Sequence, residues 1–104
     1  MVFTWDDRKN RANQQKHGIS FEAAILVFDD PLNVSTQDRE VDGEPRWQTI
    51  GMVNGIHMLI VAHTLDLDID LNRLLDKADD AEVIRILSAR KATRRERRIY
   101  AQGI

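Results

Sequence analysis

The last fifth of the chain holds a dense group of cationic side chains. The stretch LSARKATRRERRIY, residues 87–100, contains six of them in fourteen positions. Arginine binds phosphate through a rigid fork of N–H donors and keeps its charge. If Thr93 caps a helix, Arg94 and Arg95 fall in its first turn, where positive charge opposes the helix dipole but free N–H groups suit a bound anion. The stretch therefore favours a phosphate site, with a solvated cationic face as the alternative.

Three side chains could transfer protons, two of them within residues 87–100 and one near the N-terminus. Glu96 could act as a general base, although it stands three residues after Thr93, where a capping box places a glutamate. Tyr100 follows one helical turn later and could donate a proton or pack its ring under the helix. His17 could be an acid or base near neutral pH, or could stabilise a helix end before Gly18. The residue types leave these alternatives open.

Metal-dependent and nucleophilic sites are poorly supported. The chain has no cysteine, hence no disulfide framework and no thiolate metal site. Residues 66–77 place acids as a calcium loop does, but Leu71 stands where glycine is needed and Lys77 where glutamate is needed. His57 and His63 lie too far apart along a strand to share a metal. We find no Ser–His–Asp pattern, glycine-rich phosphate loop or HExxH motif, and we expect no cofactor.

The composition suits one small globular domain over residues 1–104. Hydrophobic residues make up 42% and charged residues 31%, and we expect a cytoplasmic protein because no apolar run suggests a signal peptide or a membrane span. The net charge is -2, yet residues 66–82 hold seven acids and residues 85–98 hold seven cations. The distribution of charge is therefore a better guide to partners than its sum.

Hydrophobic spacing and turn residues predict an α+β fold, a small antiparallel sheet with N-terminal helices packed on it and a short C-terminal helix. Asp6 or Thr4 should cap the first helix and Ser20 the second, with Asn54–Gly55 as a hairpin turn. In chain order we expect a strand at 2–5, a polar helix ending at 16–17, a helix over 21–28, a strand at 32–37, a loop at 38–45, strands at 46–53, 56–64 and 82–89, and a helix from Thr93 to about Gln102.

Residues 65–82 form an enlarged acidic connection between two strands, longer than hairpin loops usually are. Its first part alternates like an edge strand, and residues 71–78 have helical spacing. We expect an insertion that contains a short helix.

Three stretches together resemble the BrnT family of ribonuclease toxins, which belong to type II toxin–antitoxin pairs of bacteria. They are residues 3–31, 46–51 and 84–100. The family pattern falls on Trp5, Asp6, Lys9, Asn13, Lys16, His17, Gly18, Ser20 and Phe21, and later on Ser88, Ala89, Arg90, Ala92, Thr93, Glu96, Arg97 and Tyr100.

The resemblance implies a RelE-like fold and RNA cleavage that stops translation. It also implies a neutralising antitoxin of BrnA type, with a ribbon-helix-helix domain, possible assembly as a heterotetramer, and binding of operator DNA only through the toxin–antitoxin complex. The insertion at 65–82 departs from the family, where a short hairpin loop is usual. It could shield the basic face as an acidic flap, or add a contact to the antitoxin.

RNA supplies its own nucleophile, the 2′-hydroxyl, so a nuclease needs to orient it, move protons and neutralise charge at phosphorus, none of which requires a metal. Strand alternation puts Arg85 and Arg90 on opposite faces unless the strand ends or bulges between them. We expect catalytic roles for Arg90, Arg97, Glu96, His17 and Tyr100, and phosphate binding by Arg46, Arg94, Lys16 and Arg85, with Lys16 a further candidate for proton transfer.

A rival hypothesis is a non-catalytic protein whose basic face binds an acidic partner or a nucleic-acid backbone. Such a protein would show steep salt dependence and no cleavage. A DNA-binding regulator acting alone is a third class, for which we find no helix-turn-helix pattern.

Overall fold

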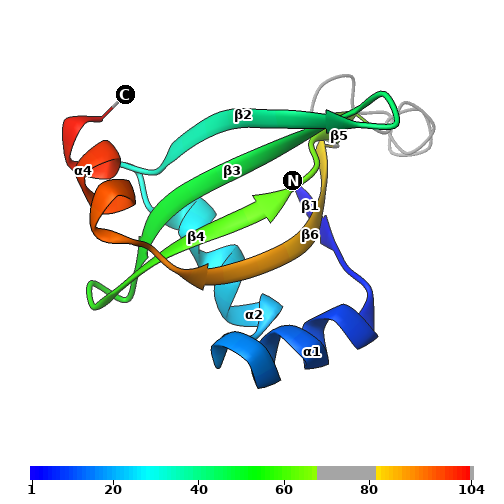
Figure 1. Cartoon of the computed structure of the whole chain (residues 1–104), viewed down its shortest axis with the longest axis horizontal. Coiled ribbons are helices and arrows are strands. Elements are labelled where there is room, and N and C mark those ends of the chain that lie inside the picture. The colour runs from blue at the N-terminus through cyan, green and yellow to red at the C-terminus, as the bar shows by residue number, and fades with distance from the viewer. Residues whose placement is uncertain (68–81, 104) are drawn as a thin grey trace.

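The computed structural model describes residues 1–67 and 82–103. A twisted sheet has the strand order β1-β6-β4-β3-β2, and the two-residue strand β5 pairs with β6 off this path (Figure 1). The strands are β1 (Val2–Thr4), β2 (Val34–Val41), β3 (Glu44–Val53), β4 (His57–His63), β5 (Asp66–Leu67) and β6 (Glu82–Lys91). The helices are α1 (Asp7–His17), α2 (Phe21–Ala24), the 3-10 helix η1 (Ile25–Asp29) and α4 (Arg94–Gln102).

The predicted α+β fold is confirmed, with one exception to the antiparallel sheet. Strands β2, β3, β4 and β6 pair antiparallel in turn. The N-terminal strand β1 instead pairs parallel with β6, with Phe3 opposite Ile84. In chain order, α1 and α2 follow β1 and precede the other strands, and α4 follows β6.

Polar side chains begin and end the two N-terminal helices as their sequence predicts. Asp6 caps α1 by accepting hydrogen bonds from the backbone N–H groups of Arg8 and Lys9. Gly18 ends the helix with φ of 71°, a left-handed conformation that glycine adopts without strain. Ser20 caps α2 through the N–H of Ala23. These caps fix the direction in which the chain enters the core.

The second helix is shorter than predicted and tightens after one turn into η1. The sequence predicts an apolar stripe at i, i+3, i+4 and i+7, which is Phe21, Ala24, Ile25 and Phe28. Phe21, Ala24 and Val27, three positions apart, are buried, and Ile25 and Phe28 are partly buried against the same core. A 3-10 helix has three residues per turn, so this spacing keeps the three side chains on one face.

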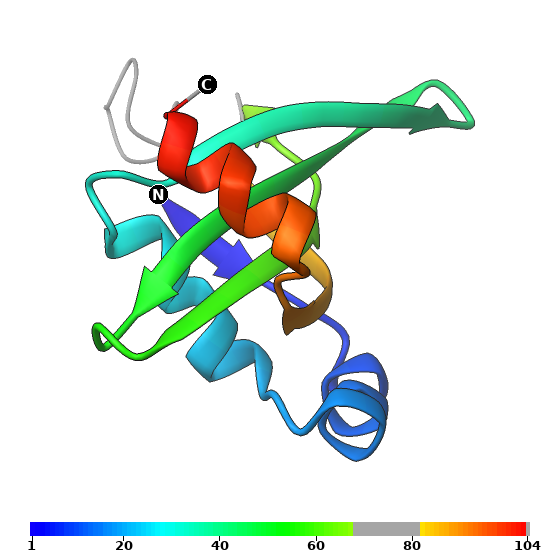
Figure 2. The same cartoon turned by 60° about the vertical axis from the view of Figure 1, so that its left-hand side comes forward.

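The turn or loop predicted over 38–45 is confirmed only at its centre, because most of these residues belong to strands. Strand β2 runs to Val41 and β3 begins at Glu44, so the turn is the dipeptide Asp42–Gly43 alone. Both turn residues have positive φ, as do Asn54 and Gly55 in the predicted hairpin turn between β3 and β4. The hairpin of β2 and β3 reaches beyond the rest of the sheet (Figure 2).

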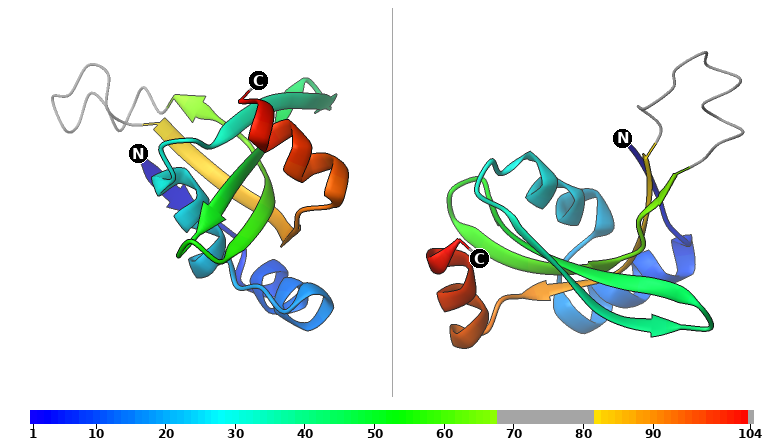
Figure 3. Two further views of the ribbon diagram at one scale, coloured as in Figure 1. Left: turned by 90° about the vertical axis from the view of Figure 1, so that its left-hand side faces the viewer. Right: turned by 90° about the horizontal axis from the view of Figure 1, so that it is seen from above.

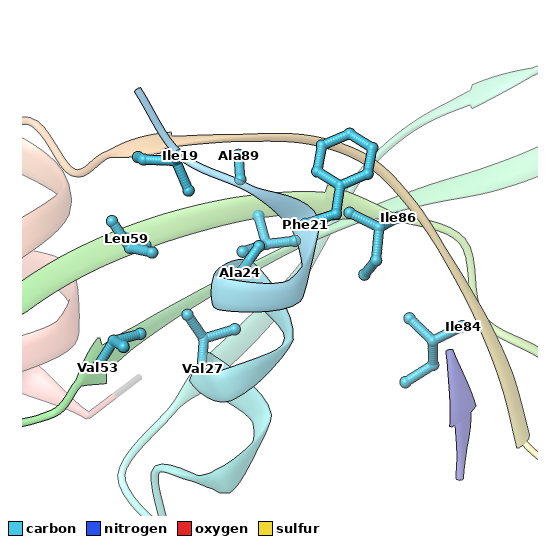
Figure 4. Close-up of a cluster of buried hydrophobic side chains, with 10 residues drawn as sticks. Ile19, Phe21, Ala24, Val27, Val53, Leu59, Ile84, Ile86 and Ala89 are labelled. Carbon is cyan, nitrogen blue, oxygen red and sulfur yellow. The ribbon is translucent and has the colours of Figure 1, made fainter. Parts of the chain in front are cut away.

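Two clusters of apolar side chains lie on opposite faces of the sheet. The larger one packs Phe21, Ala24 and Val27 against β3, β4 and β6, with Ile19 beside them (Figure 4). The smaller one joins Ile50, Met58, Ile60 and Ala92 to the partly buried residues Met52, Ile99 and Tyr100. Because Ile99 and Tyr100 belong to α4, we call this second surface the α4 face.

Contact between η1 and the sheet requires a glycine in β3. A Cβ atom on Gly51 would lie 2.8 Å from both the Cβ and the carbonyl oxygen of Val27. Only a residue without a side chain lets the 3-10 helix approach this closely.

Of the predicted insertion, the structure describes the ends alone. Asp66 and Leu67 form β5 opposite Val83 and Glu82 of β6. The helix predicted at 71–78 lies outside the described residues. Within the described ranges, no helix is long and apolar enough to cross a bilayer.

Candidate functional site

Arg90 and Glu96 form a two-point ion pair where β6 passes into α4. Arg90 Nη1 donates to Glu96 Oε1 at 2.7 Å, and Arg90 Nη2 donates to Oε2 at 2.8 Å. Nη1 also donates to the carbonyl oxygen of Lys91 at 3.2 Å. The exposed fraction is 40% for the Arg90 side chain and 16% for Glu96. The arginine is thus oriented by the protein yet open to solvent.

The predicted capping box is confirmed, and it fixes Glu96 from the other side. Glu96 Oε1 accepts the backbone N–H of Thr93 at 2.8 Å, and Thr93 Oγ1 accepts the N–H of Glu96 at 3.2 Å. Hydrogen bonds from Arg90 and from Thr93 outweigh burial and lower the pKa of Glu96 to about 2. The same carboxylate raises the pKa of Arg90. Both groups are therefore charged at neutral pH, and Glu96 is a weak proton acceptor there.

Within the described part of the chain, the hydrogen bonds of Arg90 leave one edge of its guanidinium for a ligand. Its five N–H donors form a planar fork, and the contacts to Glu96 and Lys91 use both hydrogens of Nη1 and one of Nη2. The Nε–H and the second Nη2 N–H remain side by side. This edge has the geometry that binds two oxygens of one phosphate.

The four arginines of α4, at positions 94, 95, 97 and 98, are all exposed. An α-helix turns by about 100° per residue. On that spacing Arg94 projects about 160° around the axis from Glu96, and Arg97 about 100°. Arg95 and Arg98 lie on the other flank. The structure therefore brings Arg90 and Glu96 together, but it does not bring Arg94 beside them.

A bulge in β6 places Arg85 on the same face as Arg90. Ala62 pairs with Ser88 and His63 with Ile86, so Leu87 is the extra residue. The buried positions confirm the change of alternation, since Ile84, Ile86 and Ala89 all belong to the core on the opposite face. Arg85 and Arg90 consequently both face the α4 side of the sheet.

Arg46 and Arg85 share one acidic partner, Glu44, which lies apart from Arg90. Glu44 Oε1 accepts Arg85 Nη2 at 2.7 Å and lies 3.3 Å from Arg46 Nη2. This group sits on β3 and β6, at the end of the sheet away from the α4 N-terminus (Figure 1). Of the predicted phosphate-binding arginines, these two thus form a separate cluster.

Tyr100 packs against the sheet and binds Asp30 through its hydroxyl. The hydroxyl donates to Asp30 Oδ2 at 2.6 Å, and the same oxygen accepts the N–H of Met52 at 2.8 Å. Burial raises the pKa of Asp30, but the hydrogen bonds from Tyr100, Met52 and Leu32 lower it further than burial raises it. The bond to Asp30 raises the pKa of Tyr100. An open cavity of about 410 Å³ lies beside this pair.

Lys16 and His17 are the last residues of α1, which lies beside β6, the strand that carries Arg90. Asn13, one turn earlier, donates to the carbonyl oxygen of Ala89 at 2.8 Å and accepts its N–H at 3.1 Å. Lys16 is exposed and His17 is half-buried. Ala89 faces the helix-covered core and Arg90 faces α4, so the sheet edge separates the end of α1 from the Arg90 side chain.

Many residues of the family pattern have structural tasks. Asp6, Gly18 and Ser20 cap helices, Asn13 binds the free edge of β6, and Phe21 is fully buried. We did not single out Asp30 and Glu44 as site residues from the sequence. Asp30 was marked only by its position before Pro31, which indicates a helix end, and Glu44 fell in the predicted loop.

No cation site of three or more His, Cys, Asp or Glu side chains occurs among the described residues. The arrangement on the α4 face is instead cationic, with Arg90 held by Glu96 at one end and the Glu44 cluster at the other. Arginines oriented in this way can bind phosphate groups and stabilise charge that develops on them.

Comparisons with known proteins agree with this fold. The model of a family described as the ribonuclease toxin, BrnT, of type II toxin–antitoxin systems matches residues 5–96. The crystal structure of the ribonuclease toxin BrnT of Brucella abortus is similar in fold, with a TM-score of 0.57 and 23% identity over 90% of this chain and 100% of that chain. No curated protein matches. The family match covers most of the sequence, and the chain belongs to the BrnT family of type II toxin–antitoxin ribonuclease toxins.

Proposed function

We propose that this chain is a metal-independent endoribonuclease that cleaves RNA in the cytoplasm and so inhibits translation. The observation that carries the proposal is the fixed and partly exposed Arg90, which Glu96 binds at two points at the start of a basic helix. A phosphodiester bound there would be held by an arginine that Glu96 keeps in one orientation. Such preorganisation costs no rearrangement when charge develops at phosphorus.

The reaction we propose uses the nucleophile of the substrate. The 2′-oxygen attacks the adjacent phosphorus, the bond from phosphorus to the 5′-oxygen breaks, and a 2′,3′-cyclic phosphate and a 5′-hydroxyl result. One proton leaves the 2′-hydroxyl and one reaches the departing 5′-oxygen. Arg90 and, from the exposed flank of α4, Arg97 would neutralise the phosphate, with Arg94 contacting the RNA backbone further away.

For the proton transfers, the candidates differ in what supports them. The low pKa of Glu96 favours a role in positioning Arg90 over a role as base. Histidine is the side chain that most often transfers protons in enzymes, and Lys16 adjoins His17, so we assign proton transfer to this pair, which the RNA would contact around the end of β6. Tyr100 could donate to the leaving oxygen only after releasing Asp30.

We further propose that a ribbon-helix-helix antitoxin of BrnA type neutralises this toxin. Family membership supports an antitoxin partner. The ribbon-helix-helix partner, the heterotetramer and repression of the shared operon through the complex are our expectations from the resemblance. Copurification of the chain with the product of the adjacent open reading frame, followed by operator binding assays with and without the toxin, would test them.

Cleavage of a defined RNA and of its 2′-deoxy analogue tests the proposed reaction. We expect the purified chain to cut the RNA in the presence of a chelator and to leave a 2′,3′-cyclic phosphate, which mass spectrometry identifies. A single 2′-deoxy substitution before the scissile bond should abolish cutting there. Salt-dependent RNA binding without cleavage would instead support the rival hypothesis of a non-catalytic binding protein.

A further inference from the structure

The hairpin of β2 and β3 gathers a second group of cations on the α4 face. Glu44 contacts both Arg46 and Arg85 through the same oxygen, Oε1. Arg39 lies opposite Arg46 in the β2–β3 register, and its own contact, with the exposed Asp38, is long at 4.0 Å. Cross-strand partners project to the same face of a sheet. One carboxylate thus serves two arginines and leaves the group positively charged.

Arg46 is incompletely bonded in this arrangement. Its Nε–H is buried without an acceptor among the described residues, whereas its Nη2 is the atom close to Glu44. A carboxylate or phosphate that binds an arginine at two points commonly uses neighbouring N–H groups of the fork. Glu44 uses a single oxygen for both arginines, so it contacts Arg46 through Nη2 and leaves the Nε–H of Arg46 without a partner among the described residues.

The cluster is too far from Arg90 to hold the same phosphate. Arg85 precedes Arg90 by five residues on β6, and strands rise by about 3.3 Å per residue, so the two positions are roughly 13–17 Å apart once the bulge is allowed for. A stacked strand advances by about 3.4 Å per nucleotide, which makes this distance about four to five nucleotides, and fewer if the strand is extended.

We propose that Arg46 and Arg85 form a second binding subsite for a phosphate of the RNA strand, which the phosphate enters by displacing the Glu44 carboxylate. The proposal rests on the proposed function in that RNA is the ligand. A phosphodiester carries the same single charge as the carboxylate and offers two non-bridging oxygens, enough for both guanidinium groups. Glu44 is therefore an internal competitor that weakens RNA binding, and the two arginines act on substrate length rather than on the scissile bond.

The test compares RNA long enough to reach the subsite with RNA that is too short. We would measure binding of 2′-O-methyl RNA, which lacks the nucleophile, by fluorescence anisotropy over a salt series, with one oligonucleotide of about ten nucleotides and one of about three. The protein is the full chain, with Arg46→Gln and Arg85→Gln combined. The matched control combines Arg8→Gln and Arg11→Gln at exposed positions of α1. It removes the same two positive charges, but at a distance from the α4 face.

For the long RNA we expect the subsite variant to lower the salt slope by about 0.7, the value for one lost phosphate contact on a single strand. For the short RNA the subsite variant and the control should behave alike. Equal effects of the subsite variant on both lengths, or effects no larger than those of the control, would overturn the proposal.

Glu44→Gln supplies an independent measurement with the opposite sign. Removing the competitor should tighten binding of the long RNA by about threefold to tenfold. Glu40→Gln makes the same charge change on the opposite face of β2 and should tighten it by less than about twofold. Weaker binding by Glu44→Gln would show that the carboxylate only braces the hairpin and would contradict its role as competitor.

The outcome is separable from that of the proposed function. If the subsite variant shows the expected length dependence but the chain cleaves no RNA, the proposed reaction fails and the subsite stands. If the chain cleaves RNA and the subsite variant behaves like the control, the reaction stands and the subsite is wrong.

Discussion

A single carboxylate, that of Glu96, links the start of α4 to the candidate phosphate-binding arginine. It completes the capping box with Thr93 and binds Arg90 at two points. In the sequence these tasks compete, since a glutamate three residues after a threonine is explained by capping alone. In the structure the two oxygens serve both tasks, because Arg90 lies three residues before Thr93 and its side chain faces α4. The helix start and the arginine are therefore positioned by the same atoms.

The depressed pKa of Glu96 predicts a pH dependence of folding stability. The folded pKa is about 2 and the ordinary value is 4.5, so the contribution is present above about pH 4.5 and is lost as the pH falls towards 2. Because the side chain is partly exposed, we expect Glu96→Gln to lower the free energy of unfolding by about 1–3 kcal/mol at pH 7. Urea denaturation at pH 7, 5 and 3 measures it.

The difference between wild type and Glu96→Gln should shrink between pH 5 and pH 3. Glu82→Gln, at an exposed position, serves as the control and should change stability little at any of these pH values. A difference that stays constant from pH 7 to pH 3 would mean that the ion pair with Arg90 does not stabilise the folded state.

The residue-scale features that the sequence could predict are local ones. The caps at Asp6, Ser20 and Thr93 follow from spacings of two or three residues and are confirmed. The pairing of Tyr100 with Asp30 spans seventy positions, and nothing in either neighbourhood indicates it. Whether Arg85 and Arg90 share a face depended on a bulge at Leu87, which no glycine marks in the sequence.

At the scale of elements, the two hairpins show what turn residues predict. Asn54–Gly55 indicated the β3–β4 turn, and the turn occurs there. Asp42–Gly43 carries the same kind of signal, since asparagine or aspartate before glycine favours two positive φ values. We predicted a turn or loop over the whole of 38–45, with Gly43 and Pro45 as its markers. Polar residues fit strands here because the hairpin extends beyond the core and is solvated (Figures 2 and 3).

The packing of η1 on β3 predicts a severe effect of one added methyl group. Gly51→Ala places a Cβ 2.8 Å from two atoms of Val27, closer than such atoms approach in practice. The helix or the strand must shift, and we expect the free energy of unfolding to fall by about 1–3 kcal/mol, as overpacking of a core usually costs. Urea denaturation of the variant at pH 7 measures this.

A second glycine separates crowding from backbone effects. Gly103→Ala meets nothing within 4 Å but has φ of 70°, so its cost comes from the left-handed backbone of the helix end alone. It should be near 1 kcal/mol. Unchanged stability of Gly51→Ala would contradict the close approach of η1 to β3.

For the whole molecule, the sheet divides two tasks between its faces. One face packs against α1, α2 and η1 and contains most of the buried apolar side chains (Figure 4). The other face holds α4 at one end and carries Arg90, Arg85 and Arg46 along its length. Figure 3 shows α4 and the paired helices α1 and α2 on different sides of the strands. A slightly acidic chain can thus present a cationic surface, because these three arginines lie on the same face as the exposed arginines of α4.

Periodicity predicted which elements form, but it did not predict that the arginines divide into two groups. We expected them to meet at one phosphate. The distance along β6 and the direction of Arg94 on α4 separate them. Both follow from strand rise and helix periodicity, whereas the shared face of Arg85 and Arg90 depends on the bulge at Leu87.

Single-turnover cleavage of one RNA by Arg90→Gln and by Arg95→Gln tests whether Arg90 binds the scissile phosphate. Both remove one positive charge from an arginine near the start of α4, but Arg95 is exposed and projects about 160° around the helix axis from Arg97. We expect Arg90→Gln to slow cleavage by at least about a hundredfold, as loss of a group that stabilises charge in the transition state does, and Arg95→Gln to slow it less than about threefold. Equal rates for the two variants, with both proteins folded, would contradict the claim that Arg90 binds the scissile phosphate.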